Sequence, residues 1–119
     1  MATSILKDKS FLFAIRIVKL YQHLKINSNE YVLSKQLLRS GTSIGANTRE
    51  AFNGESTKDF IHKLSIALKE ADETMYWLEL LQAASFIKKR EFESIYTGAV
   101  ELLKLLKSSI LKSKSKLVK

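Results

Sequence analysis

The chain has 119 residues and a formal net charge of +8, and it contains neither cysteine nor proline. Its length predicts one domain, residues 1–119, large enough to bury a hydrophobic core. Without cysteine, neither a disulfide framework nor a thiolate metal site is available. No apolar run approaches the roughly 20 residues that span a bilayer, and the first residues lack a signal-peptide core, so we expect a cytoplasmic protein.

The composition is that of an all-α chain, because Leu, Lys, Ile, Ala and Glu are abundant and strand signals are nearly absent. The charge is unevenly distributed: residues 1–54 carry a net +5, residues 55–87 carry −3, and residues 88–119 carry +6. A basic chain of this kind suits nucleic acid or an anionic membrane surface as a partner.

A loose arm at residues 1–7 is expected to precede the first helix, which starts near Asp8 or Ser10 and runs to about Lys25. Asn27 or Asn29 can take the left-handed stop position after it. The apolar side chains of the helix cover more than half of its circumference, which is too wide for a helix buried on one side only. We therefore expect this helix to be covered from two directions. Three of its residues are assigned to a subunit interface: Phe13, Ile17 and Leu20.

The second predicted helix, about residues 30–52, contains two glycines one turn apart. An interior glycine costs a helix about 1 kcal/mol relative to alanine, so Gly41 and Gly45 indicate the close approach of another helix. A polar strip follows another side of the same helix: Gln36, Arg39, Ser43, Asn47 and Glu50. The sequence leaves open whether this strip faces solvent or a neighbouring subunit.

The pair Asn53-Gly54 predicts a turn, and Ser56 predicts the N-terminal cap of a third helix, about residues 57–85. Away from its core stripe this helix carries a second patch: Ile66, Glu73, Trp77 and Leu80. Aromatic anchors are enriched in protein interfaces, so the patch is a candidate oligomer interface. The alternative is that these are ordinary, partly exposed apolar residues.

The fourth predicted helix starts near Glu91 and runs to Ile110 or beyond, and residues 112–119 form a basic tail. Four helices with short connections predict an antiparallel up-down-up-down four-helix bundle. Two groups of basic residues are candidates for phosphate contacts, with a merely solubilising surface as the alternative. The first group is Lys104, Lys107, Lys112, Lys114 and Lys116, and the second is Lys88, Lys89 and Arg90.

Residues for catalysis are missing from the sequence. The histidines are His23 and His62, and neither accompanies a nucleophile in a recognisable pattern. Asp59 and His62 have the spacing of one half of a di-metal carboxylate site, but the second half is absent. The glycines of the second helix follow no strand, so they do not form a phosphate loop. We expect no enzymatic activity, no cofactor and no metal.

Two segments carry a family resemblance, QLLRSGTSIGANTREA at 36–51 and STKDFIHKLSIALKEADETMYWLELL at 56–81. They are similar to the bacterial four helix bundle protein family, also called the 23S ribosomal RNA intervening-sequence protein family. The family motif Ser-Ile-x-x-Asn-x-x-Glu is matched here, with an arginine one turn before it: Arg39, Ser43, Ile44, Asn47 and Glu50. Many relatives have proline in place of Gly45 and isoleucine in place of Thr48, a departure that leaves the polar strip intact.

The resemblance covers about residues 11–106 and implies a compact four-helix protomer without enzymatic activity that assembles as a homopentameric ring. Some members of the family are encoded inside insertions in ribosomal RNA genes. The accessory proteins of diversity-generating retroelements look like distant relatives, and they work with a reverse transcriptase and nucleic acid. A reverse transcriptase or another protein is therefore a further candidate partner.

The leading hypothesis is a non-catalytic homo-oligomer that binds RNA or DNA through phosphate contacts. A ring of five would carry a nominal charge of about +40, and its binding would be sequence-tolerant and salt-dependent. No aromatic residues interleave with the lysines of the fourth helix, which argues against a dedicated single-strand reader. The alternatives are a protein–protein scaffold without a nucleic-acid role and, less favoured, a membrane-surface helix at the C-terminus.

Overall fold

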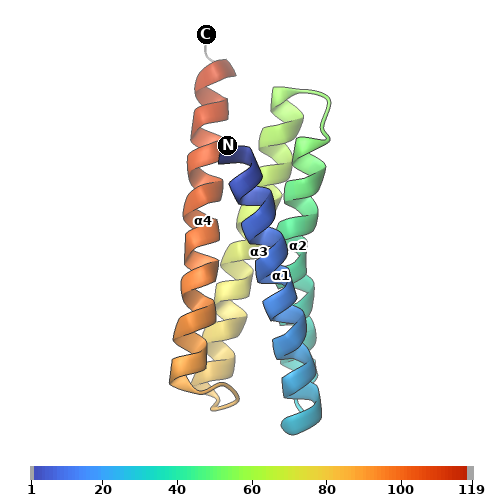
Figure 1. Cartoon of the computed structure of the whole chain (residues 1–119), viewed down its shortest axis with the longest axis vertical. Coiled ribbons are helices and arrows are strands. Elements are labelled where there is room, and N and C mark those ends of the chain that lie inside the picture. The colour runs from blue at the N-terminus through green and yellow to red at the C-terminus, as the bar shows by residue number, and fades with distance from the viewer. Residues whose placement is uncertain (1, 118–119) are drawn as a thin grey trace.

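The computed structural model describes residues 2–117, and the side chains of residues 5–117. Four α-helices occupy nearly all of this part: α1 (Ala2–Asn27), α2 (Val32–Phe52), α3 (Thr57–Ala83) and α4 (Lys89–Leu117). In Figure 1 the chain reverses at each short connection, so that α1 and α3 run downward and α2 and α4 run upward. The described part is 52 Å long and about 21 Å across. The all-α, four-helix prediction is confirmed.

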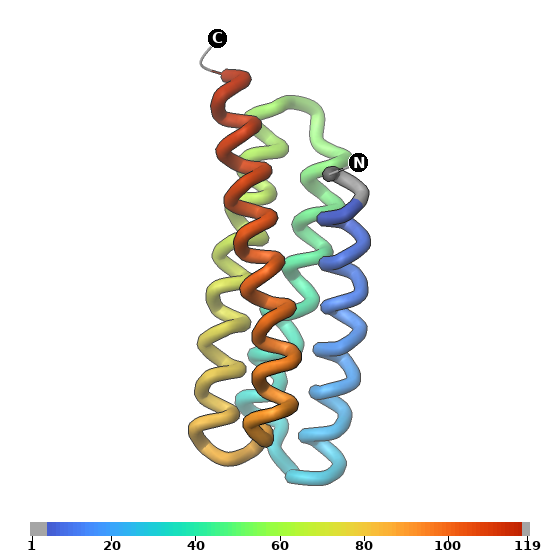
Figure 2. The backbone as a smooth tube through the Cα atoms, turned by 60° about the vertical axis from the view of Figure 1, so that its left-hand side comes forward, coloured from blue at the N-terminus to red at the C-terminus, as the bar shows by residue number. Residues whose placement is uncertain are grey.

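Each helix packs beside its neighbours in the chain, with the closest association between α2 and α3. The tube in Figure 2 shows the four rods arranged around a common axis. Among neighbouring helices α1 and α4 lie least closely together, and the backbones of α1 and α3 do not come close along the described chain. Helices α1 and α3 therefore occupy diagonal corners, and their outer faces lie on opposite sides of the bundle. No helix within residues 2–117 has an apolar stretch that meets the length needed to cross a membrane.

The connections follow the expected local chemistry. Asn29 adopts a left-handed conformation with φ of 53°, as predicted for the stop after the first helix. The Glu30 carboxylate then accepts hydrogen bonds from the amides of Leu33 and Ser34 at 2.9 and 2.8 Å, which satisfies two orphan donors at the start of α2. At the start of α3 the Ser56 hydroxyl accepts from the Asp59 amide at 3.0 Å, so the predicted cap is confirmed.

The two chain ends correct the sequence-based expectation. Residues 2–7 belong to α1 rather than to a loose arm, because Leu6 is buried against the bundle and secures the first turns. Likewise α4 continues through the expected basic tail to Leu117, with Ser113 buried. Residues 118–119 of that tail lie outside the described part. The fourth helix also begins at Lys89, two residues before the expected Glu91.

The glycines of α2 lie against α1. A Cβ atom on Gly41 would lie 2.7 Å from Ile17 Cγ1, closer than side chains approach, and one on Gly45 would lie 3.3 Å from the Ser10 carbonyl oxygen. Close packing against α1 is therefore what offsets the helix-propensity cost of Gly41. Ile17 is fully buried by this contact, within the core that all four helices share.

The assignment of Phe13, Ile17 and Leu20 to a subunit interface is wrong. Their exposed fractions are 4%, 0% and 6%, so they belong to the core of the protomer. The apolar residues that α1 leaves exposed lie on its opposite side, because successive residues turn by about 100° around a helix. Ile5 and Ile26 lie near the two ends of α1, and the middle of this side is here called the α1 apolar face: Phe11, Leu12, Ile15 and Val18, which are 56%, 60%, 38% and 38% exposed.

Candidate nucleic-acid interface

All of the basic residues proposed for phosphate contacts are exposed, but the fold places them in separate groups. Lys88, Lys89 and Arg90, the N-terminal cluster of α4, lie at the lower end of the bundle in Figure 1. Lys112, Lys114 and Lys116, the C-terminal cluster of α4, lie at the upper end. At a rise of about 1.5 Å per residue, roughly 33 Å of helix separates the two clusters. They therefore do not form one compact patch.

Cations from α1 join the N-terminal cluster of α4. Arg16 donates a hydrogen bond to the Ser94 hydroxyl at 2.9 Å, which fixes its guanidinium at the seam between α1 and α4. Arg16, Lys19 and His23 line a shallow depression of about 240 Å³ at this seam together with Glu91. Arg90 directly precedes Glu91 along the chain, so the depression lies at the same end of the bundle as the cluster. The sequence alone did not associate Arg16 or Lys19 with the cluster, because α1 and α4 are remote in the chain.

The backbone of α4 acts differently on its two clusters. A helix carries about half a positive charge at its N-terminus and half a negative charge at its C-terminus, so cations stabilise the last turn and destabilise the first. Lys114 and Lys116 occupy the last turn, where they are favourable. Lys88 starts the first turn, since its carbonyl oxygen accepts from the Phe92 amide at 2.8 Å. Helix stability therefore explains the C-terminal cluster but not the N-terminal one.

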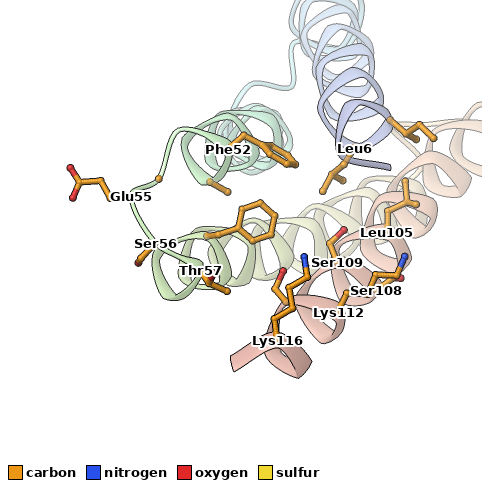
Figure 3. A pocket seen from close by; sticks show the side chains of 15 residues that line it. Leu6, Phe52, Glu55, Ser56, Thr57, Leu105, Ser108, Ser109, Lys112 and Lys116 are labelled. Carbon is orange, nitrogen blue, oxygen red and sulfur yellow. The ribbon is translucent and has the colours of Figure 1, made fainter. Parts of the chain in front are cut away.

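The lysines of α4 also lie on two different sides of the helix. Lys104, Lys107 and Lys114 share an outer face with Leu111, which is 67% exposed, because their spacing places them within one arc of the helix. Lys112 and Lys116 lie on another side and border a hollow at the upper end of the bundle. Figure 3 shows both on the α4 wall of this hollow, across from Phe52 of α2.

The family-motif strip on α2 is engaged within the protomer. Arg39 pairs with Glu70 at 3.2 Å and with Glu73, and Lys63 pairs with Glu50 at 2.9 Å. The other two polar members bond to their own helix: Ser43 Oγ donates to the Arg39 carbonyl and Asn47 Nδ2 donates to the Ser43 carbonyl, at 2.6 and 2.9 Å. Ile44 is fully buried. Arg39 and Glu50 thus link α2 to α3, whereas Ser43 and Asn47 bond within α2.

The predicted patch on α3 remains partly exposed. Trp77 Nε1 donates to the Glu73 carboxylate at 3.0 Å, so the tryptophan is held by the same group that binds Arg39. Ile66 and Leu80 are half-buried beside it. Tyr76, which the sequence-based patch omitted, packs edge-on against Trp77 with ring centroids 5.1 Å apart and is 57% exposed. The patch is therefore more aromatic than its sequence spacing suggested.

A groove of about 890 Å³ lies beside the α1 apolar face. Its walls come from α1 and α2, with Phe11 and Leu12 on one side and Gly45 and Ala46 on the other. The small residues of α2 leave the groove open, while the exposed side chains of α1 make one wall apolar. The groove is also lined by charged residues, among them Lys7, Asp8 and Arg49, so its surface is mixed.

Two titratable groups are perturbed by pairs that hold helices together. The Glu79 carboxylate accepts from the Tyr96 hydroxyl at 2.6 Å and, with some burial, raises the pKa of Tyr96 to about 12. The hydrogen bond and charge of Glu50 raise the pKa of Lys63. Across the described residues, no three His, Asp or Glu side chains converge as a metal site requires.

These features define a basic, all-α four-helix bundle protein with cationic clusters at both ends of α4. The chain belongs to the 23S rRNA-intervening sequence protein family, whose model matches residues 3–108. It is also similar to a solved structure from Bacteroides thetaiotaomicron, a protein with unknown function from the S23 ribosomal protein family. The two are 55% identical with a TM-score of 0.91, over 92% of this chain and 98% of that one. No curated protein matches the chain.

Proposed function

We propose that the protein is a non-catalytic homo-oligomer that binds RNA or DNA through phosphate contacts. The observation that carries the proposal is the N-terminal cluster of α4, where three consecutive cations, Lys88, Lys89 and Arg90, stand at the positive end of a helix. Such a placement costs stability, which Glu91 in the first turn offsets only in part and which a bound anion would offset further. Arg16 and Lys19 add charge at the same seam. The backbone phosphates of a nucleic acid are the polymeric anions that bind to a cationic surface of this kind.

The family assignment supports this reading in one respect. The matching family is named for intervening sequences of 23S rRNA, so the gene of this chain is proposed to lie in such an insertion or beside another nucleic-acid-processing element. A reverse transcriptase would be a protein partner in the second case. The non-catalytic part of the proposal rests on the absence of cysteine from the sequence and on two exposed histidines, His23 and His62.

Self-association is proposed to join two unlike faces. The α1 apolar face has Lys7, Asp8 and Lys19 beside it, which sum to +1. The α3 patch around Tyr76 and Trp77 has Lys69, Asp72 and Glu79 beside it, which sum to −1. The two faces point away from each other on diagonal helices. A contact between unlike faces is heterologous, and it closes into a ring when the rotation per subunit allows. We propose the homopentamer that the family resemblance implies.

Filter binding of RNA and of circular duplex DNA across a salt series tests the nucleic-acid part. Affinity should fall steeply with salt, by about 0.9 logarithmic units per logarithmic unit of salt for each phosphate contacted on duplex DNA. Binding that is absent at low salt, or that does not change with salt, would contradict it.

Light scattering tests the assembly. Ile15→Glu on the α1 apolar face should dissociate the oligomer, because it places a charge in an apolar contact. The matched control is Leu111→Glu on the outer face of α4, at a side chain that is even more exposed. A wild-type monomer of 13.6 kDa, or equal effects of the two changes, would refute the assignment of the face.

A further inference from the structure

The hollow at the upper end of the bundle brings together residues that are remote in the sequence. It has a volume of about 680 Å³, within the range of roughly 300–1,000 Å³ that is usual for small-molecule sites. It lies where α1 and α3 begin and where α2 and α4 end (Figure 3). Its chemistry is mixed, with an apolar floor, a ring of hydroxyl groups and two ammonium groups.

The floor contains an aromatic pair. Phe52 at the end of α2 and Phe60 at the start of α3 pack edge-to-face with ring centroids 5.2 Å apart, and both remain partly exposed. Lys7 Nζ lies 5.7 Å from the centroid of the Phe52 ring, which adds positive charge near the floor. A planar base can pack on such rings, and stacking on aromatic side chains is tolerant of base identity. The fold thus supplies the aromatic residues that the sequence of α4 lacked.

The α4 wall of the hollow supplies two cations. Lys112 and Lys116 form no ion pair with a carboxylate of the described residues. Among the described residues that line the hollow, Glu55 is the sole acid, and its carboxylate points away from the centre in Figure 3. The hollow therefore favours an anionic group on any ligand.

The hydroxyl of Ser113 opens toward the hollow. Ser113 continues the inward-facing side of α4 after Ile110 and is only 8% exposed, yet its hydroxyl makes no hydrogen bond to another side chain or carbonyl of residues 5–117. No side-chain polar atom in the described part is both fully buried and unpaired, so this hydroxyl is reached from the hollow that Ser113 lines. A leucine at this position would complete the core, whereas serine leaves a polar group for a ligand.

We infer that this end hollow binds a nucleoside monophosphate, either free or as the terminal nucleotide of a strand. The base packs on Phe52 and Phe60, the hydroxyls of Ser108, Ser109 and Ser113 hydrogen-bond to polar groups of the nucleoside, and Lys112 and Lys116 hold the phosphate. The several hydroxyls favour a nucleoside over an acyl chain, which would leave them unpaired. The inference rests on the proposed nucleic-acid function only where the nucleotide belongs to a strand.

Calorimetric titration with adenosine 5′-monophosphate at low salt tests the site. Adenosine and inorganic phosphate should each bind more weakly by about tenfold or more, because each lacks one half of the contacts. The double change Lys112→Gln and Lys116→Gln should weaken binding by about tenfold or more. The matched control, Lys104→Gln with Lys107→Gln, removes the same charge from the outer face of α4 and should change affinity by less than about twofold.

A second variant separates loss of the site from loss of the fold. Ser113→Leu removes the hydroxyl and narrows the hollow beside Lys112 and Lys116, so it should weaken nucleotide binding about tenfold or more while the melting temperature stays equal or rises. Failure of adenosine 5′-monophosphate to bind the wild type, equal effects of the two lysine pairs, or full binding by Ser113→Leu would each overturn the inference.

Competition identifies the source of the nucleotide. If adenosine 5′-monophosphate displaces a linear 5′-phosphorylated RNA but not the same RNA in circular form, the hollow takes strand ends. If it binds without displacing either, the ligand is a free nucleotide. If the protein binds circular duplex DNA but not the mononucleotide, nucleotide binding in the hollow is refuted and the proposed nucleic-acid function still stands. If the protein binds the mononucleotide but neither RNA nor circular duplex DNA, only the proposed nucleic-acid function is refuted.

Discussion

The two ends of α4 carry three cations each, but these cations stand against opposite ends of the same helix dipole. At the C-terminal end, Lys114 and Lys116 stabilise the last turn, so they are favourable there with or without a bound ligand. At the N-terminal end, Lys89 and Arg90 oppose the dipole, and Glu91 offsets only part of the cost. Two clusters with the same number of cations therefore do not give equally strong evidence for a binding site. The cluster that costs stability is the better indicator of a binding role.

Charge reversal of each cluster should give the largest effect. The variant K88E/K89E/R90E should lose about 100-fold or more in affinity for circular duplex DNA at low salt, and its salt slope should become shallower by about 3. The variant K112E/K114E/K116E changes the net charge by the same amount and should lose about tenfold. Filter binding measures both. Equal losses would mean that only total charge matters and would remove the distinction between the two ends.

The α1 contribution to the N-terminal end should be smaller. Arg16→Gln should reduce affinity about fivefold, because the guanidinium is held by the neutral Ser94 and keeps its charge for a phosphate. The control is Lys9→Gln, since Lys9 already pairs with Glu101 at 2.9 Å. Filter binding at one fixed salt concentration compares the two. An effect of Lys9→Gln as large as that of Arg16→Gln would place the contact surface elsewhere on α1.

Single substitutions should show the dipole effect directly in stability. Lys89→Glu should raise the free energy of unfolding by about 0.3–1 kcal/mol, and Lys114→Glu should lower it by a similar amount. Urea denaturation of both variants provides the measurement. Changes of the same sign would contradict the explanation given for the C-terminal cluster.

The hydrogen bond that fastens the N-terminal half of α4 to α3 should give the smallest effect. Because the pKa of Tyr96 is raised to about 12 in the folded state, its contribution is complete below pH 10 and is lost as the pH rises from 10 to 12. Tyr96→Phe should lower stability at pH 8 by about 0.5 kcal/mol, since the pair is partly exposed. The difference from wild type should vanish near pH 12. A difference that stays constant over this range would exclude the Glu79 bond as its source.

Local chemistry made much of the fold predictable. Ser56 as a cap and Asn29 as a left-handed stop act over a few residues, so the sequence indicated where α1 ends and α3 begins. The starts of α1 and α4 were misplaced because tertiary contacts decide them. Leu6 secures turns that have no capping signal, and Lys89 begins a helix against the preference of its own charge.

The candidate sites divide in the same way. The sequence identified the exposed lysines correctly, because charged side chains are almost always solvated. It did not separate Lys112 and Lys116 from Lys104 and Lys107, and it could not place Phe52 and Phe60 beside the first pair, since four chain segments meet there. It also chose the wrong side of α1, because both sides are apolar.

By itself the sequence determined that the protein is a basic, all-α bundle without cysteine chemistry, since composition and periodicity act residue by residue. Only the tertiary structure decided which side of α1 is core. Ile17 fits against Gly41, where a larger residue on α2 would collide, and this packing turns Phe11, Leu12, Ile15 and Val18 outward. The tertiary structure likewise forms the seam at Arg16 and the hollow at Ser113, from residues that meet only when the four helices pack.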